Sequence, residues 1–142
     1  MNSGFFVDSN VIMYAVGAEH AYRGPCLDAL GRIIREDLGA TVSTEVHQEI
    51  LHRYMAIGLP DKAREVSIRL ETIIPATLPV TLADIRQVRQ LAERYPELKA
   101  RDLVHAAVML ENGLTRILST DRHFDRLVEI ERIDPVDFCR NA

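Results

Sequence analysis

Residues 4–10, Gly-Phe-Phe-Val-Asp-Ser-Asn, place a short apolar run directly before three polar side chains. Residues 115–121, Thr-Arg-Ile-Leu-Ser-Thr-Asp, repeat this arrangement near the other end of the chain. Short apolar runs closed by polar turn residues are typical of buried strands in a parallel sheet. Because ligands bind beyond the carboxyl ends of such strands, we expect Asp8 and Asp121 to lie in one crevice. Two carboxylates in one crevice indicate a metal site.

The segments between these two runs predict an alternation of helices and short strands. Proline in a first turn, glycine after a last turn and the capping-box pattern at residues 81–84 mark the helix ends. We predict helices over about 25–38, 44–57, 60–72, 82–95 and 101–112. Further short strands are expected at 40–42, within 73–81 and at 130–133. This order predicts an α/β fold whose parallel sheet is covered on both faces.

The bulk composition restricts the class of protein. A chain of 142 residues fits a single domain, residues 1–142, and its 47% apolar and 27% charged residues are ordinary for a soluble protein. The apolar stretches are too short to cross a membrane, and the N-terminus lacks a signal-peptide pattern. With two cysteines and no metal-like spacing, we expect a cytoplasmic protein. The net charge of −4 predicts that any nucleic-acid contact is local and metal-assisted.

Two further acids, Glu49 and Asp102, lie in predicted helices that must pack on the sheet. Both acids can therefore lie near the edge of the sheet where the strands have their carboxyl ends. Several carboxylates in one crevice cannot all stay ionised unless a cation joins them. Oxygen ligands select hard ions such as Mg²⁺ or Mn²⁺, and such an ion suits phosphodiester hydrolysis. Glu45, one turn before Glu49, is an alternative for the same role.

In four segments the sequence resembles the PIN-domain ribonucleases, and among them the VapC-like toxins of toxin–antitoxin pairs. The similarity extends over essentially the whole chain, and it is carried by residues 7–10, 42–50, 100–107 and 117–124. The resemblance implies a three-layer α/β/α PIN-like domain with a central, mainly parallel sheet of about five strands. It also implies metal-dependent RNA cleavage, a homodimer and inhibition by a cognate VapB-like antitoxin.

The same resemblance implies a role for individual residues. Four carboxylates would form the catalytic cluster around Mg²⁺, with Mn²⁺ as a substitute: Asp8, Glu49, Asp102 and Asp121. Three of them would be the metal ligands: Asp8, Asp102 and Asp121. Three polar side chains would hold the cluster by hydrogen bonds: Ser9, Asn10 and Ser119. Arg122 and Arg101 are candidate substrate contacts, because a phosphate chain needs positive groups beside an anionic site.

Histidines suggest an alternative chemistry. Glu49 with His52, and Asp102 with His105, have the acid-x-x-His spacing that di-iron helix bundles use. Strand-like runs interrupt the helices, however, which argues against a four-helix bundle. We therefore interpret His105 as a core histidine with a satisfied ring and His52 as a surface residue. His123 is the histidine expected to lie close enough to touch a substrate.

The main prediction is an endoribonuclease that cuts a folded RNA with an exposed loop. One alternative keeps the fold without catalysis, as a metal- or RNA-binding module. Another keeps the nuclease but makes its substrate DNA or a structured flap. Each acid also has a simpler interpretation, because Asp8 and Asp121 can cap turns and Asp102 can serve its helix dipole. Asp125 is either an auxiliary acid or a solvated turn residue.

Overall fold

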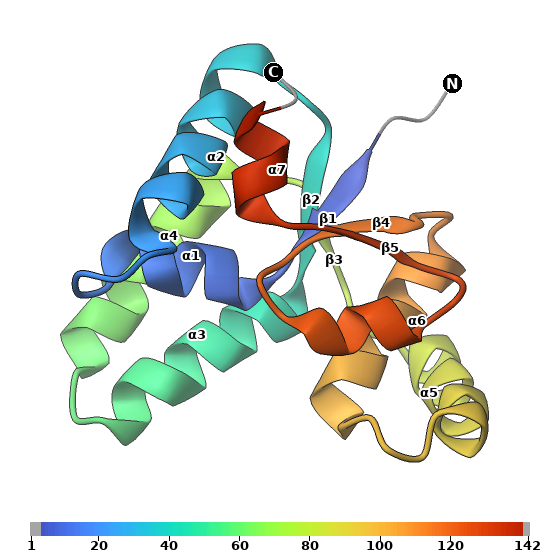
Figure 1. Cartoon of the computed structure of the whole chain (residues 1–142). Helices are drawn as coiled ribbons and strands as arrows, with labels where there is room; N and C mark the ends of the chain where they lie inside the picture. The colour runs from blue at the N-terminus through green and yellow to red at the C-terminus, as the bar shows by residue number, and fades with distance from the viewer. Residues whose placement is uncertain (1–3, 141–142) are drawn as a thin grey trace.

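The computed structural model describes residues 4–140, which contain a five-stranded sheet in the order β3-β2-β1-β4-β5 (Figure 1). Its strands are β1 (Phe5–Val7), β2 (Ala40–Ser43), β3 (Thr77–Leu78), β4 (Arg116–Leu118) and β5 (Glu131–Ile133). All four pairings in this sheet are parallel. The chain extends the sheet from β1 to β2 and β3 on one side, and later to β4 and β5 on the other. The boundary between β1 and β4 is therefore a topological switch point, where open α/β sheets bind ligands.

Helices cover both faces of this sheet (Figure 1). One layer contains α1 (Ser9–Val16), α2 (Arg23–Glu36), α3 (Thr44–Ala56), α4 (Pro60–Ile73) and α7 (Pro135–Arg140). The other contains α5 (Leu82–Arg94) and α6 (Ala100–Glu111), which pack as a pair. A short 3₁₀ helix, η1 (Arg122–Arg126), joins β4 to β5. The predicted three-layer α/β/α fold is thus confirmed.

The strands sit in the middle of the hydrophobic core. Phe6 and Val7 of β1 and Ile117 of β4 have no exposed surface, as expected for strands covered on both faces. Helix α6 packs closely on the sheet because Ala106 and Ala107, both fully buried, carry small side chains. Burying a large apolar side chain contributes roughly 1.5–3 kcal/mol to the stability of the fold. The buried side chains between α6 and the sheet therefore fix the position of this helix. The position of α6 matters because Asp102 lies in its first turn.

Most predicted helix ends agree with the structure. Ser43 caps α3 by accepting a hydrogen bond from the backbone N–H of Val46, and Thr81 with Asp84 forms the predicted capping box of α5. Helix α2 begins at Arg23, two residues before the predicted start, and ends at Glu36. The connection to β2 then needs left-handed backbone at Gly39, where φ is 78°. Helices α1 and α7 were not predicted.

One cluster of buried apolar residues runs through the described part of the chain, residues 4–140. The prediction of a single domain over 1–142 stays a prediction, because residues 1–3 and 141–142 lie outside that part. Within residues 4–140, every helix is too short or too polar to cross a membrane.

Candidate active site

Four different elements bring the predicted acids to the carboxyl edge of the sheet. Asp8 follows β1 and caps α1, where its side chain accepts a hydrogen bond from the backbone N–H of Ser9. Asp121 follows β4 and caps η1 in the same way. Asp102 lies in the first turn of α6, and Glu49 lies in the middle of α3. Both of the caps considered in the sequence analysis therefore exist, and each capping carboxylate also lies beside other acidic side chains.

Asp8, Glu49 and His105 form what we call the inner acidic group. One ligand atom from each residue lies within 4.8 Å of the others. His105 Nε2 is 2.7 Å from Glu49 Oε1 and 3.7 Å from Asp8 Oδ1. The side chains are buried: His105 is 1% exposed and Asp8 5%. These distances place an imidazole between two carboxylates inside the protein.

Hydrogen bonds from neutral donors fix the inner acidic group at the β1–β4 boundary. Asp8 Oδ2 accepts from Ser119 Oγ at 2.7 Å and from Asn10 Nδ2 at 3.0 Å. Ser119 Oγ also accepts from the backbone N–H of Asp121 at 3.0 Å. On the other side, Ser9 Oγ donates to Glu49 Oε1 at 3.0 Å. The three polar residues expected to hold the cluster thus contact the acids directly.

Asp102, Asp121 and His123 form the outer acidic group. Their ligand atoms also lie within 4.8 Å of one another. His123 Nδ1 is 3.0 Å from Asp121 Oδ1 and 3.8 Å from Asp102 Oδ2. The His123 side chain is 50% exposed, so this group faces solvent. His123 therefore lies at the acidic cluster, where the sequence predicted that it could meet a substrate.

The charges of the two groups act on each other. Burial and the charges of Asp121 and Asp8 raise the pKa of Asp102 from 3.8 to about 6. Burial also raises the pKa of Asp8, although His105 and the hydrogen bond from Ser119 oppose this effect. Since the ionised form of Asp102 is disfavoured by two neighbouring carboxylates, the two groups belong to one crevice with an excess of negative charge.

Glu49 and His105 respond in the opposite way because they pair. Burial favours neutral Glu49, but its hydrogen bond and attraction to His105 outweigh burial and lower its pKa. Burial favours neutral His105 as well, but the hydrogen bond that it donates to Glu49 and the charge of Asp8 raise its pKa. His105 Nδ1 has no hydrogen-bond partner within residues 4–140. The predicted burial of His105 is confirmed, whereas the prediction of a fully satisfied ring is wrong.

Other predicted residues lie at the edges of the crevice. Arg101 and Arg122 are exposed, and the charge of Arg101 acts on both Glu45 and Glu49. Glu45 is partly buried near Glu49, but the contacts to Ser9 and His105 belong to Glu49. Exposed His52 lies on the surface, as predicted.

Arg132 of β5 is a residue that sequence analysis missed. Its guanidinium donates to Asp125 Oδ1 at 2.9 Å, to Asp134 Oδ2 at 3.2 Å and to the carbonyl of Ser119 at 3.0 Å. Asp125 is therefore a turn acid paired with Arg132. Arg132 therefore fixes the turn after β4 that carries Ser119 and Asp121, and Ser119 in turn contacts Asp8. A lone arginine in a short strand gives no sequence signal for this contact.

The donor set fits a divalent cation. Carboxylate oxygens are the ligands that Mg²⁺ and Mn²⁺ prefer, and each group offers two carboxylates. Burial, and after it the charges of Asp121 and Asp8, raise the pKa of Asp102, so a nearby cation would favour its ionised form. A divalent ion bound between the groups would balance this charge.

Comparison with known proteins agrees with this geometry. The PIN domain family model matches residues 5–130. The chain belongs to the PIN domain family. It is 37% identical over 131 residues to VapC ribonuclease Mb1869c of Mycobacterium bovis and to Ribonuclease VapC13 of Mycobacterium tuberculosis. Both alignments cover 89% of this chain and 97% of the relative.

Solved structures share the PIN fold at low sequence identity. VapC20 of Mycobacterium tuberculosis, described as a Sarcin-Ricin loop cleaving toxin, gives a TM-score of 0.71 at 20% identity and covers 89% of this chain and 98% of its own. VapBC2 of Rickettsia felis, bound to a promoter DNA fragment, gives a TM-score of 0.72 at 10% identity, with 91% and 96% coverage. The predicted PIN family is confirmed, and the parallel sheet excludes a di-iron helix bundle.

Proposed function

We propose that this chain is a metal-dependent endoribonuclease, the toxin of a VapBC-type toxin–antitoxin pair. The observation that carries the proposal is the convergence of four carboxylates at the β1–β4 switch point. The PIN family and relatives named VapC ribonucleases support RNA as the substrate. We expect a single-stranded loop to be cut, because its backbone is accessible and its bases can splay apart.

The proposed roles follow the contacts of each residue. Asp8, Asp102 and Asp121 would hold Mg²⁺, and Mn²⁺ would replace it. When bound, the ion lowers the pKa of a water and stabilises charge on the phosphoryl oxygen. Glu49 stays ionised because His105 lowers its pKa, so its carboxylate can accept a hydrogen bond from the attacking water and orient it. Three polar side chains keep the acids in place: Ser9, Asn10 and Ser119.

A cleavage assay tests this proposal. Purified protein is incubated with total small RNA and with single- and double-stranded DNA, in Mg²⁺, in Mn²⁺ and in a chelator. We expect metal-dependent cuts in RNA that disappear in Asp8→Asn and Asp102→Asn. Asp28→Asn, an exposed carboxylate of α2 outside both acidic groups, is the matched control and should cut like the wild type.

Other outcomes of the same assay identify the alternatives. Cleavage of DNA or a flap instead of RNA would make the chain a DNA nuclease of the PIN family. No cleavage with either ion, together with toxicity that survives Asp8→Asn on expression, would leave a metal- or RNA-binding module without catalysis.

We also propose a cognate VapB-like antitoxin as partner. The fold is shared with toxin–antitoxin complexes such as VapBC-1 of nontypeable Haemophilus influenzae. A homodimer is proposed on the basis of the family resemblance, and light scattering of the purified chain would test it. A mass of two chains supports the dimer, whereas 16.1 kDa would contradict it. Co-expression with the adjacent reading frame, followed by co-purification, would test the antitoxin.

A further inference from the structure

A groove begins at the acidic site and runs between α1 and α3. Its cavity of about 790 Å³ is lined at one end by Ser9, Asn10 and Glu49, which belong to the site. Further along, its walls come from the last turn of α1, the α1–α2 connection and the α3–α4 connection. Lys62 of α4 lies at that far end, where its Nζ donates to the carbonyl of Val16 at 3.3 Å. The groove therefore opens directly out of the proposed catalytic centre.

Positive charge distinguishes this groove in a chain of net charge −4. Arg53, Lys62 and Arg101 line it, against the two acids Glu19 and Glu49. Arg101 lies near the site end, because its charge acts on Glu49. Arg53 follows Glu49 by one helical turn, about 6 Å along α3. The cations are thus distributed along the groove from its site end to its far end.

The groove also presents aromatic rings. The Tyr14 ring lies 4.6 Å from the exposed ring of His20, and both residues line the groove. Lys62 Nζ lies 5.0 Å from the centre of the Tyr54 ring. Aromatic faces stack on any base, and each stacked base contributes about 1–3 kcal/mol. Tyr14 and His20 thus supply ring faces in the same groove as the cations, the two features that a single-stranded nucleic acid uses.

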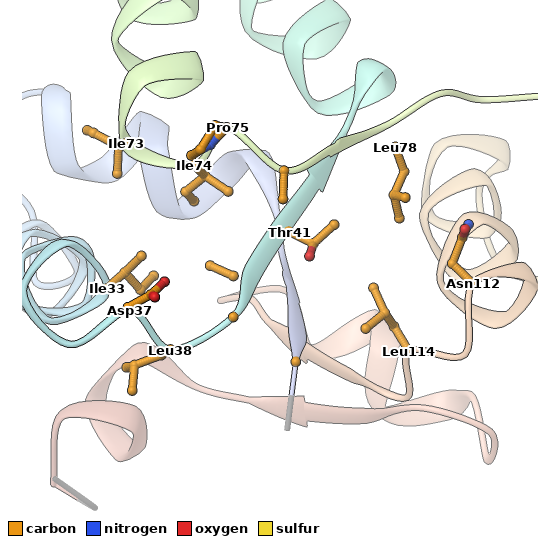
Figure 2. A pocket seen from close by; sticks show the side chains of 14 residues that line it. Ile33, Asp37, Leu38, Thr41, Ile73, Ile74, Pro75, Leu78, Asn112 and Leu114 are labelled. Atoms are coloured by element: carbon orange, nitrogen blue, oxygen red, sulfur yellow. The ribbon is translucent and has the colours of Figure 1, made fainter. Parts of the chain in front are cut away.

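A cavity at the opposite edge of the sheet shows the contrast (Figure 2). It measures about 720 Å³ and lies at the start of β1 and β2. Among the residues that line this cavity, all within 4–140, Asp37 has the one charged side chain. Apolar side chains such as Ile74 and Leu114 form much of the cavity wall. This cavity offers no positive charge to the phosphates of a nucleic acid. Positive charge together with direct contact with the acidic site therefore selects the α1–α3 groove.

We infer that the α1–α3 groove binds the single-stranded RNA that flanks the scissile bond. This inference rests on the ribonuclease function proposed above and adds the path of the substrate. Phosphates pair with Arg101, Arg53 and Lys62, and bases stack against Tyr14 and His20. Phosphate contacts position a strand without specifying its sequence, so the groove sets the register of the backbone at the acidic site.

Binding of a labelled RNA tests the groove. Fluorescence anisotropy is measured with a 20-nucleotide, unstructured, mixed-sequence RNA in chelator over a series of NaCl concentrations. We compare wild type with the double variant Arg53→Gln/Lys62→Gln. Removing two phosphate contacts should weaken binding about tenfold at low salt and reduce the slope of log affinity against log salt by about 1.4, since each contact to a single strand contributes roughly 0.7.

The matched control removes two arginines from the exposed surface of α4. Arg64 and Arg69 pair with Asp61 and Glu65 of their own helix and do not line the groove. Arg64→Gln/Arg69→Gln should bind RNA within about twofold of wild type. The single variant Arg53→Glu changes one exposed side chain and leaves the contacts of Lys62 intact. It therefore tests the groove even if the loss of Lys62 disturbs the fold.

The result separates this inference from the function on which it rests. If the groove variants bind RNA with wild-type affinity and salt slope, the groove does not bind RNA. An equal loss of affinity in the α4 control would also contradict RNA binding in the groove. That result, combined with metal-dependent cleavage by wild type, overturns the groove alone and leaves the surface to another occupant, such as a peptide. Absence of any cleavage by wild type would overturn the ribonuclease function, whatever the binding data show.

Discussion

The inner and outer acidic groups each combine two carboxylates with one histidine, but they balance their charge differently. In the inner group, Glu49 pairs with His105, and Asp8 accepts hydrogen bonds from Asn10 and Ser119. In the outer group, burial and the charges of Asp121 and Asp8 raise the pKa of Asp102 to about 6. The fold itself therefore stabilises the ionised form of Glu49, whereas Asp8 and Asp102 have raised pKa values and would gain from a bound cation. A site of this kind is half assembled by the protein and completed by its ligand.

The largest expected effect comes from Asp102→Asn, because it separates stability from activity. The variant should lose RNA cleavage by on the order of 10³-fold or more, as expected when a metal ligand is removed. In chelator at pH 7 it should nevertheless unfold at higher denaturant concentration than wild type, by roughly 1–3 kcal/mol, because it removes an ionised group that its neighbours repel. Urea unfolding and a cleavage assay on the same preparation measure both. A variant that is inactive and also less stable would contradict this view of the outer group.

His105 tests the inner group. Replacing it with leucine removes the donor to Glu49 and leaves that buried carboxylate with the hydrogen bond from Ser9. We expect cleavage to fall about 10–100-fold, the range found when a partner that orients a ligand is lost. His105→Gln, which keeps a donor, should recover part of the activity. If both variants lose activity only in proportion to their unfolded fraction, measured by circular dichroism, His105 acts as a packing residue alone.

The dependence of stability on pH should carry the signature of Asp102. Its pKa in the folded chain, about 6, lies above its ordinary value of 3.8. Folding therefore favours the protonated form, so its contribution to stability is complete below about pH 4 and is lost as pH rises to about 6. Asp8, whose pKa is also raised, contributes in the same direction. Glu49 has a lowered pKa, so its contribution to the stability of the protein is lost as the pH falls below the ordinary pKa of a glutamate. The difference in unfolding free energy between wild type and Asp102→Asn isolates Asp102. It should grow by roughly 1–3 kcal/mol between pH 4 and pH 7 in chelator, and a constant difference would contradict the assignment.

The smallest expected effect concerns Glu45. Glu49 makes the contacts to Ser9 and His105, so Glu49→Gln should reduce cleavage about 10–100-fold. Glu45→Gln, one turn earlier on the same helix, should change cleavage by less than about threefold. Initial rates at saturating Mg²⁺ measure both. A larger loss in Glu45→Gln than in Glu49→Gln would show that the two residues have exchanged roles.

The sequence predicted the elements that local chemistry defines. Apolar runs ending in Asp8 and Asp121 identified two strands of the sheet, and the capping box at Thr81 identified α5. Helix α1 was missed because Asp8, interpreted as the end of a strand, is also the cap of the helix that follows. Helix α7 was missed because six residues that begin with a proline carry little periodic signal.

Contacts between distant elements could not be predicted. His105 faces Glu49 only because α6 and α3 converge on opposite sides of β1, and Arg132 reaches Ser119 only because β5 lies beside β4. In sequence, His105 belongs to an apolar helix and looks like any buried residue. The division of the acids into two groups follows from these contacts, so it emerged from the structure alone.

One measurement tests the difference between the two acidic groups most directly. The free energy of unfolding at pH 7 is measured for wild type and Asp102→Asn, each in chelator and in a series of Mn²⁺ concentrations. We predict that Mn²⁺ stabilises wild type, by about 2.7 kcal/mol when its concentration is a hundred times the dissociation constant, and leaves Asp102→Asn unchanged. Equal stabilisation of both proteins, or of neither, would contradict a cation site that depends on the outer acidic group.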